Sequence, residues 1–406
     1  MVAREDVAGD QRLVAYVTPH RDRDPAPDLP MRFGLFYFAE GEGGGLNSDI
    51  YRLYLEGAKL ADELGLAAIW TPERHFTNVA AAYPNPSVLS AAVATITKRI
   101  QLRAGSVVLP LHDPLRVVEE WSVVDHLSGG RVGVSFAPGW IPDDFVLAPD
   151  RYEDRAAITT RMLAEVRELW RGNSIVRRNG RGADVHVRAL PRPVQQELPA
   201  WLTTSSKRGF EFAGALGVNV LTALLKQSVE DLTENIRRYR ASLAEHGHDP
   251  SRFTVTLMVH TFVAENEEVA LATSREPLRQ YLASHAQLRE DVVRGSALEE
   301  LSNLDRDLLL DEVLKRYLSQ ASLIGSPATC VPFVERLHGI GVNEIACLID
   351  FGIGTEDILQ NLKYLRRLQD CSSLRLGNGD LRSHLKRSLP DYMVPSAFVV
   401  LDALPL

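Results

Sequence analysis

Short apolar runs alternate with segments of helical period through most of this chain. The apolar runs are strand-like in length and fall at 32–38, 67–73, 100–110, 131–139, 200–206, 219–224, 253–264 and 344–350. Helical periodicity fills the intervals, most clearly over 50–65 and 152–170. Strands that alternate with helices are typical of a parallel sheet. Eight repeats over about 340 residues favour an α/β fold of the closed (β/α)8 TIM barrel type, with insertions, over an open sheet.

Two segments depart from this repeat. The run VHVRAL at 185–190 predicts an inserted hairpin, and the stretch 266–322 holds extra helix that makes it the largest predicted insertion.

Polar segments rich in proline, glycine and serine flank the repeat, at 18–30 and 369–380. Such composition is typical of linkers. We therefore divide the chain into an N-terminal piece (1–30), a barrel (31–369) and a C-terminal piece (370–406). The first piece has one strand-like run, at 12–17. The last has a short amphipathic helix and the tail LPDYMVPSAFVVLDALPL. We expect neither end to bury a core alone.

Composition excludes several classes of function. The chain of 406 residues is 45% hydrophobic and 24% charged, with a formal net charge of −8. The sequence has no basic stripe with interleaved aromatic residues, which argues against nucleic-acid binding. No apolar run approaches the roughly 20 residues of a membrane span. The first residues are charged where a secretory signal is apolar. Three widely spaced cysteines show no metal-binding spacing, so the sequence predicts a reduced, cytoplasmic protein without a structural metal.

A TIM barrel carries its chemistry where strands end and βα loops begin. After the second strand, WTPERHFTN places His75 among polar neighbours, where an imidazole can act as acid or base. A plain surface histidine is the alternative. After the third strand, Gly105 and Ser106 are small residues against which a flat ligand could lie. The alternative there is a strand with a glycine bulge.

The fifth strand ends in four consecutive hydroxyl residues, Thr203, Thr204, Ser205 and Ser206, at the start of a helix. Free N–H groups and the positive dipole end of a helix suit a phosphate, and hydroxyls add donors. An ordinary helix cap, which needs one hydroxyl, is the alternative. A phosphate site and a histidine on one barrel rim suggest a phosphorylated cofactor without identifying it.

Residues 31–369 resemble the luciferase-like flavin monooxygenases. The shared motifs include ERHF at 73–76, NPSVLSAA at 85–92, the long run at 104–140, TTSSKRGFEFAGALGVNVLT at 203–222 and LIGSPATCVPFVERL at 323–337. The resemblance implies FMN as the cofactor. It implies that His75 is the active-site histidine, that the Gly105–Ser106 peptide is cis beneath the flavin ring, and that Thr204, Ser205 and Ser206 form the phosphate loop. Bacterial luciferase has an arginine where this chain has Pro138. The phosphate charge would then be met by the hydroxyls, Lys207 or Arg208.

Both ends resemble consecutive pieces of the small C-terminal subdomain of a nonribosomal peptide synthetase adenylation domain. A barrel whose termini approach each other can be inserted in this way. The tail stops before the segment that carries that family's catalytic lysine, so we expect no adenylation.

The resemblance thus implies a monooxygenase that receives reduced FMN from a separate flavin reductase. With O2 it would oxidise an aminoacyl or peptidyl thioester held on a carrier protein, beside the rest of the synthetase. The oxidation is expected at the α-carbon or the amine, with α-hydroxylation the preferred expectation. Whether the chain forms a homodimer stays open.

Two other hypotheses remain at this stage. A deazaflavin-dependent dehydrogenase on the same barrel would move hydride and ignore O2. A non-catalytic scaffold between synthetase domains would need neither His75 nor the hydroxyl loop.

Overall fold

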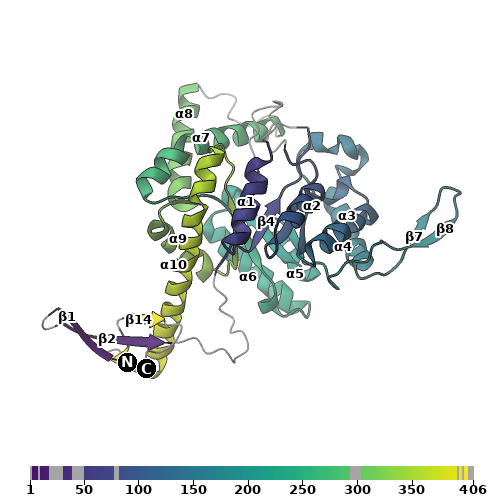
Figure 1. Cartoon of the computed structure of the whole chain (residues 1–406). Coiled ribbons are helices and arrows are strands. Elements are labelled where there is room, and N and C mark those ends of the chain that lie inside the picture. Colours follow the sequence, from purple (N-terminus) through teal and green to yellow (C-terminus); the bar gives the residue numbers. More distant parts are fainter. Residues whose placement is uncertain are drawn as a thin grey trace.

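Eight parallel strands close into a barrel (Figure 1). The computed structural model describes residues 2–7, 10–17, 31–38, 50–76, 82–292, 303–390, 393–395 and 397–400. In order round the barrel the strands are β3 (Arg32–Phe36), β4 (Ala68–Thr71), β5 (Gln101–Val108), β6 (Val132–Ala137), β9 (Ala200–Thr203), β10 (Asn219–Ala223), β11 (Val255–Val263) and β13 (Glu344–Leu348). Pairing of β13 with β3 closes the ring. The predicted (β/α)8 barrel is confirmed, and each strand lies inside its predicted range.

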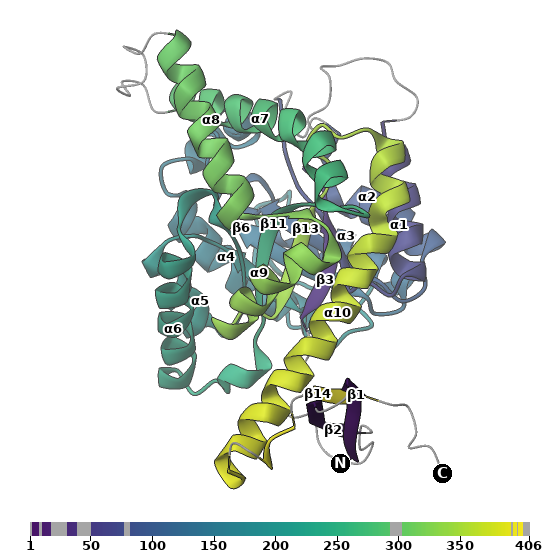
Figure 2. The same cartoon turned by 90° about the vertical axis from the view of Figure 1, so that its left-hand side faces the viewer.

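Helices cover the outside of the barrel (Figures 1 and 2). They are α1 (Arg52–Glu63), α2 (Pro86–Ile96), α3 (Pro114–Ser128), α4 (Arg155–Trp170), α5 (Lys207–Leu216), α6 (Val229–Glu245), α9 (Pro327–Gly339) and α10 (Thr355–Ser388). Short 3-10 turns are η1 (Leu109–Leu111), η2 (Pro142–Leu147), η3 (Pro149–Arg151), η4 (Leu224–Lys226) and η5 (Pro250–Arg252).

The insertions contain the expected elements and one further strand. The segment 266–322 holds α7 (Glu267–Val292) and α8 (Asn303–Gln320), and the hairpin of β7 (Ile175–Arg178) and β8 (Asp184–Val187) projects from the barrel in Figure 1. The sequence analysis missed β12 (Ser322–Gly325), which pairs in parallel with the last residues of β11. Four residues are too few to show a period.

Local sequence explains where helix α3 begins and ends. The Asp113 side chain accepts a hydrogen bond from the backbone N–H of Leu115, and Pro114 occupies the first turn, where its missing N–H costs nothing. The helix ends at Gly129, whose φ of 68° is left-handed. These signals fix the loop that connects β5 to α3 on the rim of the barrel.

An ion pair crosses the inside of the barrel. Nη1 of Arg103, on β5, donates to Oε1 of Glu344, on β13, at 2.5 Å, and the Glu344 side chain has no exposed surface. The guanidinium also lies 5.0 Å from the ring centre of Trp70 and 4.5 Å from that of Trp201. Because β4 and β3 separate β5 from β13, this contact joins strands that are not neighbours in the sheet.

The two ends of the chain meet in a small sheet. It contains β1 (Val2–Val7), β2 (Asp10–Val17) and β14 (Ala397–Val400), with β14 parallel to β2. The N-terminal piece therefore has two strands, where the sequence predicted one. In Figure 2 the sheet lies by the end of α10 that extends beyond the barrel.

The predicted linker at 369–380 is wrong as local structure, because α10 continues through it. Its composition is polar, but it contains no proline. A helix interior tolerates a glycine at about 1 kcal/mol, so Gly377 and Gly379 do not break it.

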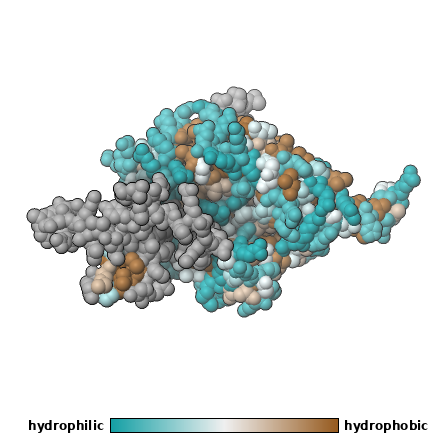
Figure 3. All heavy atoms as spheres, turned by 60° about the horizontal axis from the view of Figure 1, so that its bottom comes forward, coloured by the Kyte–Doolittle hydropathy of each residue, from teal (hydrophilic) through white to brown (hydrophobic). Residues whose placement is uncertain are grey.

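No helix in the described ranges is long and apolar enough to cross a membrane. On the face shown in Figure 3, hydrophobic residues form patches that hydrophilic residues interrupt.

We expect Glu344→Gln to lower the free energy of unfolding by about 3–5 kcal/mol, because it leaves the buried Arg103 charge without its partner. Urea unfolding followed by circular dichroism measures this. Glu230→Gln is the matched control, since Glu230 pairs with Arg336 at the surface and its loss should change stability little. Equal effects of the two substitutions would contradict this account of the interior.

Candidate active site

A cavity of about 310 Å³ lies at the carboxyl ends of the barrel strands. Residues within β5 and residues that follow β4, β6 and β9 line it, and its apolar wall includes Phe36, Val108, Leu221 and Met258. This volume is at the lower end of the range for small-molecule sites, and a mostly apolar wall with a few polar groups is typical of them.

The Gly105–Ser106 peptide bond is cis, as the resemblance implied, and both residues line the cavity. Gly105 is also sterically required. A Cβ at this position would lie 2.7 Å from Cε2 of Phe36 and 3.2 Å from Cε3 of Trp70. This stretch of backbone therefore packs directly on aromatic rings and leaves the cavity side clear.

The four-hydroxyl segment divides into an inner and an outer part. Thr203, at the end of β9, turns inward: its Oγ1 lies 2.5 Å from Oγ of Ser106 and 2.7 Å from Oγ of Ser135. Ser206 caps α5, with its Oγ accepting from the N–H of Gly209 at 3.1 Å. A Cβ at Gly209 would come within 1.9 Å of Thr204 Oγ1, so glycine allows Thr204 to sit against the helix start.

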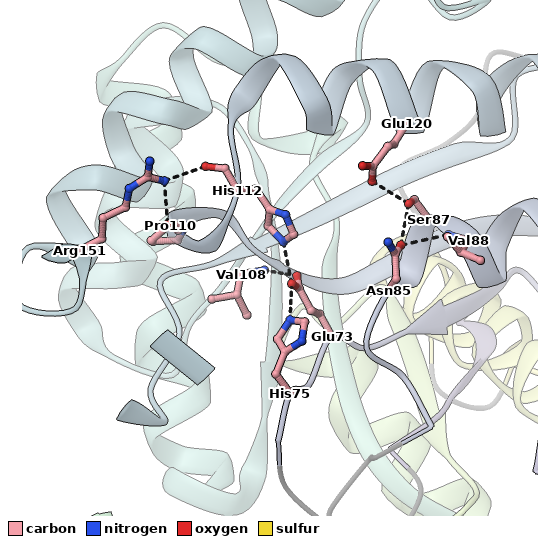
Figure 4. Close-up of polar contacts among 10 residues, drawn as sticks. All are labelled: Glu73, His75, Asn85, Ser87, Val88, Val108, Pro110, His112, Glu120 and Arg151. Atoms are coloured by element: carbon pink, nitrogen blue, oxygen red, sulfur yellow. Dashed lines mark hydrogen bonds and ion pairs between the residues drawn. The ribbon is translucent and has the colours of Figure 1, made fainter. Parts of the chain in front are cut away.

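A buried carboxylate connects two histidines (Figure 4). Oε1 of Glu73 lies 2.9 Å from Nε2 of His75 and 2.6 Å from Nε2 of His112, and Oε2 accepts from the N–H of Val108 at 2.7 Å. An ionised carboxylate only accepts hydrogen bonds, so Nε2 of each imidazole carries a hydrogen. In neutral His75 the proton-accepting atom is therefore Nδ1.

Electrostatics favour the charged forms of Glu73 and His112. Burial acts to raise the pKa of Glu73, but the hydrogen bonds from His112, His75 and Val108 outweigh it and hold that pKa below its usual value. Burial likewise acts to lower the pKa of His112, and the hydrogen bond and charge of Glu73 raise it instead.

A second buried pair lies beside this cluster, because Asp144 also accepts a hydrogen bond from the backbone of His75. Nη1 of Arg74 donates to Oδ2 of Asp144 at 3.3 Å. The Arg74 guanidinium also lies 5.3 Å from the ring centres of both Phe38 and Trp140. Burial lowers the pKa of Arg74 and raises that of Asp144. All four side chains belong to residues that line the cavity, so they present an arginine held between two aromatic rings.

The structure brings most of the predicted site residues together. Gly105, Ser106, Thr203, Thr204 and Ser205 line the cavity, whereas His75 and Ser206 do not. His75 contacts the cavity-lining Glu73, and Ser206 caps the adjoining helix.

Sequence reasoning missed Glu73 as the centre of the histidine cluster and missed the Arg74–Asp144 pair. The ERHF motif contains Glu73 and Arg74, and could have indicated both. Asp144 lies 70 residues from Arg74, and no short-range pattern connects them.

The sequence model of luciferase-like monooxygenases matches residues 31–344. This chain belongs to the luciferase-like monooxygenase family. It is therefore an oxidoreductase, and the match covers the barrel from its first strand to the start of its last.

Relatives in this family differ in what they act on. The oxygenase component of a flavin-dependent trigonelline monooxygenase from Acinetobacter baylyi is 26% identical over 337 residues, which cover 80% of this chain and 91% of that protein. Among solved structures, the oxygenating constituent of 3,6-diketocamphane monooxygenase from Pseudomonas putida, in complex with FMN, has a TM-score of 0.68 at 18% identity. That alignment covers 84% of this chain and 97% of the other.

The same fold also serves another cofactor. An F420-dependent secondary alcohol dehydrogenase, in complex with an F420–acetone adduct, has a TM-score of 0.61 at 16% identity, over 82% of this chain and 98% of the other. Likeness at this level of identity shows the fold, so family membership leaves the choice between FMN and a deazaflavin open.

We expect the Glu73–His112 pair to make stability depend on pH. The folded-state pKa of His112 is raised, so its contribution is complete below its unfolded value of about 6.5 and is lost as pH rises through the folded value. The advantage of the wild type over His112→Gln in free energy of unfolding should therefore shrink as the pH rises above about 6.5 and through the raised folded-state pKa. Urea unfolding at a series of pH values tests this; an advantage that grows with pH would contradict it.

Proposed function

We propose that this chain is an FMN-dependent monooxygenase that receives reduced flavin from a separate reductase and uses O2 to oxidise its substrate. The observation that carries the proposal is the cavity that has Gly105–Ser106 on one wall and the start of α5 beside it. Membership of the luciferase-like family supports it. So does the two-component nature of a relative, which is named as an oxygenase component.

The residues present fit a flavin. Gly105 leaves room where a side chain would collide with Phe36, and the apolar wall suits a flat ring system. Thr204, Ser205 and the first N–H groups of α5 would hold the phosphate, with Lys207 and Arg208 exposed at the first turn. This donor set contains no buried cation, which agrees with an exchangeable cofactor that arrives reduced and departs oxidised.

When bound, reduced flavin would supply the two electrons that split O2, so that one oxygen atom enters the substrate and the other leaves as water. The chain's own residues do the rest. The aromatic and aliphatic wall excludes water from the reacting groups. His75, with Nε2 bonded to Glu73, presents Nδ1 as an atom that can take or give a proton.

For the substrate we propose an aminoacyl or peptidyl thioester on a carrier protein, oxidised at the α-carbon. The support is the resemblance of both chain ends to an adenylation subdomain, and the small sheet in which β2 and β14 pair. Division at residues 30/31 and 369/370 into subdomain piece, barrel and subdomain piece is part of this proposal. Because α10 continues across residues 369/370, it would make the junction between the barrel and the C-terminal piece rigid.

A deazaflavin-dependent dehydrogenase is the second candidate, because the F420-dependent alcohol dehydrogenase shares this fold. It would pass hydride to or from the substrate without consuming O2. The scaffold hypothesis has less support, since a buried charged network at a cavity is costly to keep without a use.

The test is to mix protein and reduced FMN with aerated buffer and follow the return of oxidised-flavin absorbance together with O2 uptake. The wild-type protein should bind FMN, and it should change the rate at which O2 oxidises reduced FMN relative to the protein-free reaction. Gly105→Ala should weaken FMN binding about tenfold or more, about 1.4 kcal/mol. The control Gly180→Ala, where an added Cβ meets nothing within 4 Å, should behave as wild type.

Other outcomes would redirect the proposal. Oxidation of FMN at its protein-free rate, with tight binding of reduced F420, would establish the dehydrogenase instead. If the protein binds neither cofactor, the hypothesis of a non-catalytic scaffold remains. With FMN binding established, a synthetic aminoacyl thioester should gain one oxygen atom from labelled O2; an unchanged thioester would reject the proposed substrate class and leave the flavin proposal standing.

A further inference from the structure

The guanidinium of Arg74 lies at the wall of the active-site cavity with part of its hydrogen-bonding capacity unused. Among the described residues only Nη1 has an acceptor, Oδ2 of Asp144 at 3.3 Å. Nε is buried without a partner, and Nη2 has no acceptor in these ranges either. The side chain keeps 7% of its surface exposed, and Arg74 lines the cavity. Nη2 is therefore the nitrogen that a molecule in the cavity can reach.

Neighbouring segments of the barrel rim keep this guanidinium in place. Its centre lies 5.3 Å from the ring centres of Phe38 and Trp140, within the range of cation–π contacts. The backbone N–H of Phe38 donates to Oδ1 of Asp350 at 2.6 Å, which fixes the residues after β3. Gly139 has a φ of 79°, and a Cβ there would lie 2.8 Å from two neighbouring side chains, so glycine is required just before Trp140.

Asp144 makes this part of the cavity electrically neutral. Its side chain is 1% exposed, pairs with Arg74, and also accepts a hydrogen bond from the backbone of His75. An anionic ligand would therefore meet no net positive charge, and it would lose its hydration on entering a largely apolar cavity. A neutral group with a hydrogen-bond-accepting oxygen loses much less and still finds the N–H donors of the guanidinium.

We propose that Arg74 binds the carbonyl oxygen of the substrate, so that the cavity selects a neutral carbonyl compound over a carboxylate of the same size. The inference deepens the proposed function and rests on it for the identity of this carbonyl as that of a thioester. Arg74 would touch the substrate, whereas Asp144 is a positioning residue that acts through Arg74.

The place of Arg74 on the rim leaves the proposed flavin contacts free. Arg74 follows β4, whereas Thr204 and Ser205 follow β9, and β5 and β6 lie between these two strands. The Gly105–Ser106 peptide belongs to β5, which pairs with β4. We therefore expect a carbonyl compound held by Arg74 to lie beside the wall assigned to the flavin ring, away from the phosphate end.

The same contact would favour reaction at the α-carbon. A hydrogen bond from a guanidinium draws electron density toward the carbonyl oxygen, and this makes the neighbouring α-carbon easier to deprotonate. Such a donor stabilises negative charge that develops on the oxygen, and it does so most effectively where water is excluded. One arginine would thus both hold the substrate and determine which of its carbons reacts.

Infrared spectroscopy of a bound probe tests the contact without turnover. The probe is the N-acetylcysteamine thioester of N-acetylglycine with carbon-13 at the thioester carbonyl, added to the protein with and without saturating oxidised FMN. In wild type this carbonyl should absorb at lower wavenumber than in an apolar solvent, because it accepts a hydrogen bond. Arg74→Met/Asp144→Leu removes both charges together, so no buried charge loses its partner. In that variant the carbonyl should absorb near its apolar-solvent value, and Kd should rise about tenfold or more.

A pair of small ligands of equal size tests the selectivity. Wild type should bind N-acetylglycinamide, which is neutral, at least about tenfold more tightly than the N-acetylglycine anion. Asp144→Asn should narrow this difference, because the charge of Arg74 is then no longer neutralised. The matched control is Arg178→Met/Asp184→Leu, which changes the same residue types in an exposed pair on the β7–β8 hairpin. It should behave as wild type in both measurements.

Three results would each overturn the proposal: an unshifted carbonyl in wild type, a shift that persists in Arg74→Met/Asp144→Leu, or no binding of the thioester in either flavin state. If that variant fails to fold, the carbonyl frequency in wild type and its preference for N-acetylglycinamide decide the question. A shifted carbonyl in a protein that does not react with reduced FMN would disprove the proposed function and leave Arg74 as the carbonyl-binding residue. Reaction with FMN beside an unshifted carbonyl would do the reverse.

Discussion

The closure of the sheet between β13 and β3 brings the carboxyl ends of eight strands into one ring, and every contact at the candidate site depends on it. Inside the ring, the Arg103–Glu344 pair joins strands that do not pair with each other. A charge pair buried among tryptophan rings loses much of its stabilisation unless both partners are held in place. At the amino ends of the strands, this ion pair thus connects opposite parts of the barrel interior. At the carboxyl end, the same strands leave a cavity.

At that cavity, the geometry of one loop determines the chemistry. After β4, the side chain of Glu73 contacts His75 and His112, and that of Arg74 contacts Asp144. Consecutive side chains thereby join two neighbouring polar networks, and Asp144 also accepts a hydrogen bond from the backbone of His75. Thr203 ties β9 to the Gly105–Ser106 wall through Ser106 and Ser135. Rigid strands position these groups, which is the support that a site needs if its polar groups are to keep their places.

Sequence alone predicted the strands of the barrel well, because buried parallel strands are apolar runs of limited length. It also found the hydroxyl segment, because this follows a strand end. Gly105 and Ser106 were expected after their strand but lie within β5, where its register against β6 shifts between Gly105 and Val107. It placed a linker where α10 continues, since composition reports polarity and a solvated helix face is polar too. It missed the Arg74–Asp144 pair and the shared carboxylate of Glu73, because contacts between side chains from different loops leave no local period. His112 lies 39 residues from Glu73, and only the fold brings them together.

The central claim is that the carboxyl-end cavity of this luciferase-like monooxygenase is built for FMN. The most direct measurement is a crystal structure of the chain grown with FMN. The account predicts the flavin ring against Gly105–Ser106, with its phosphate at the N-terminus of α5 beside Thr204 and Ser205. FMN bound at another place, or an empty cavity at saturating FMN, would contradict it.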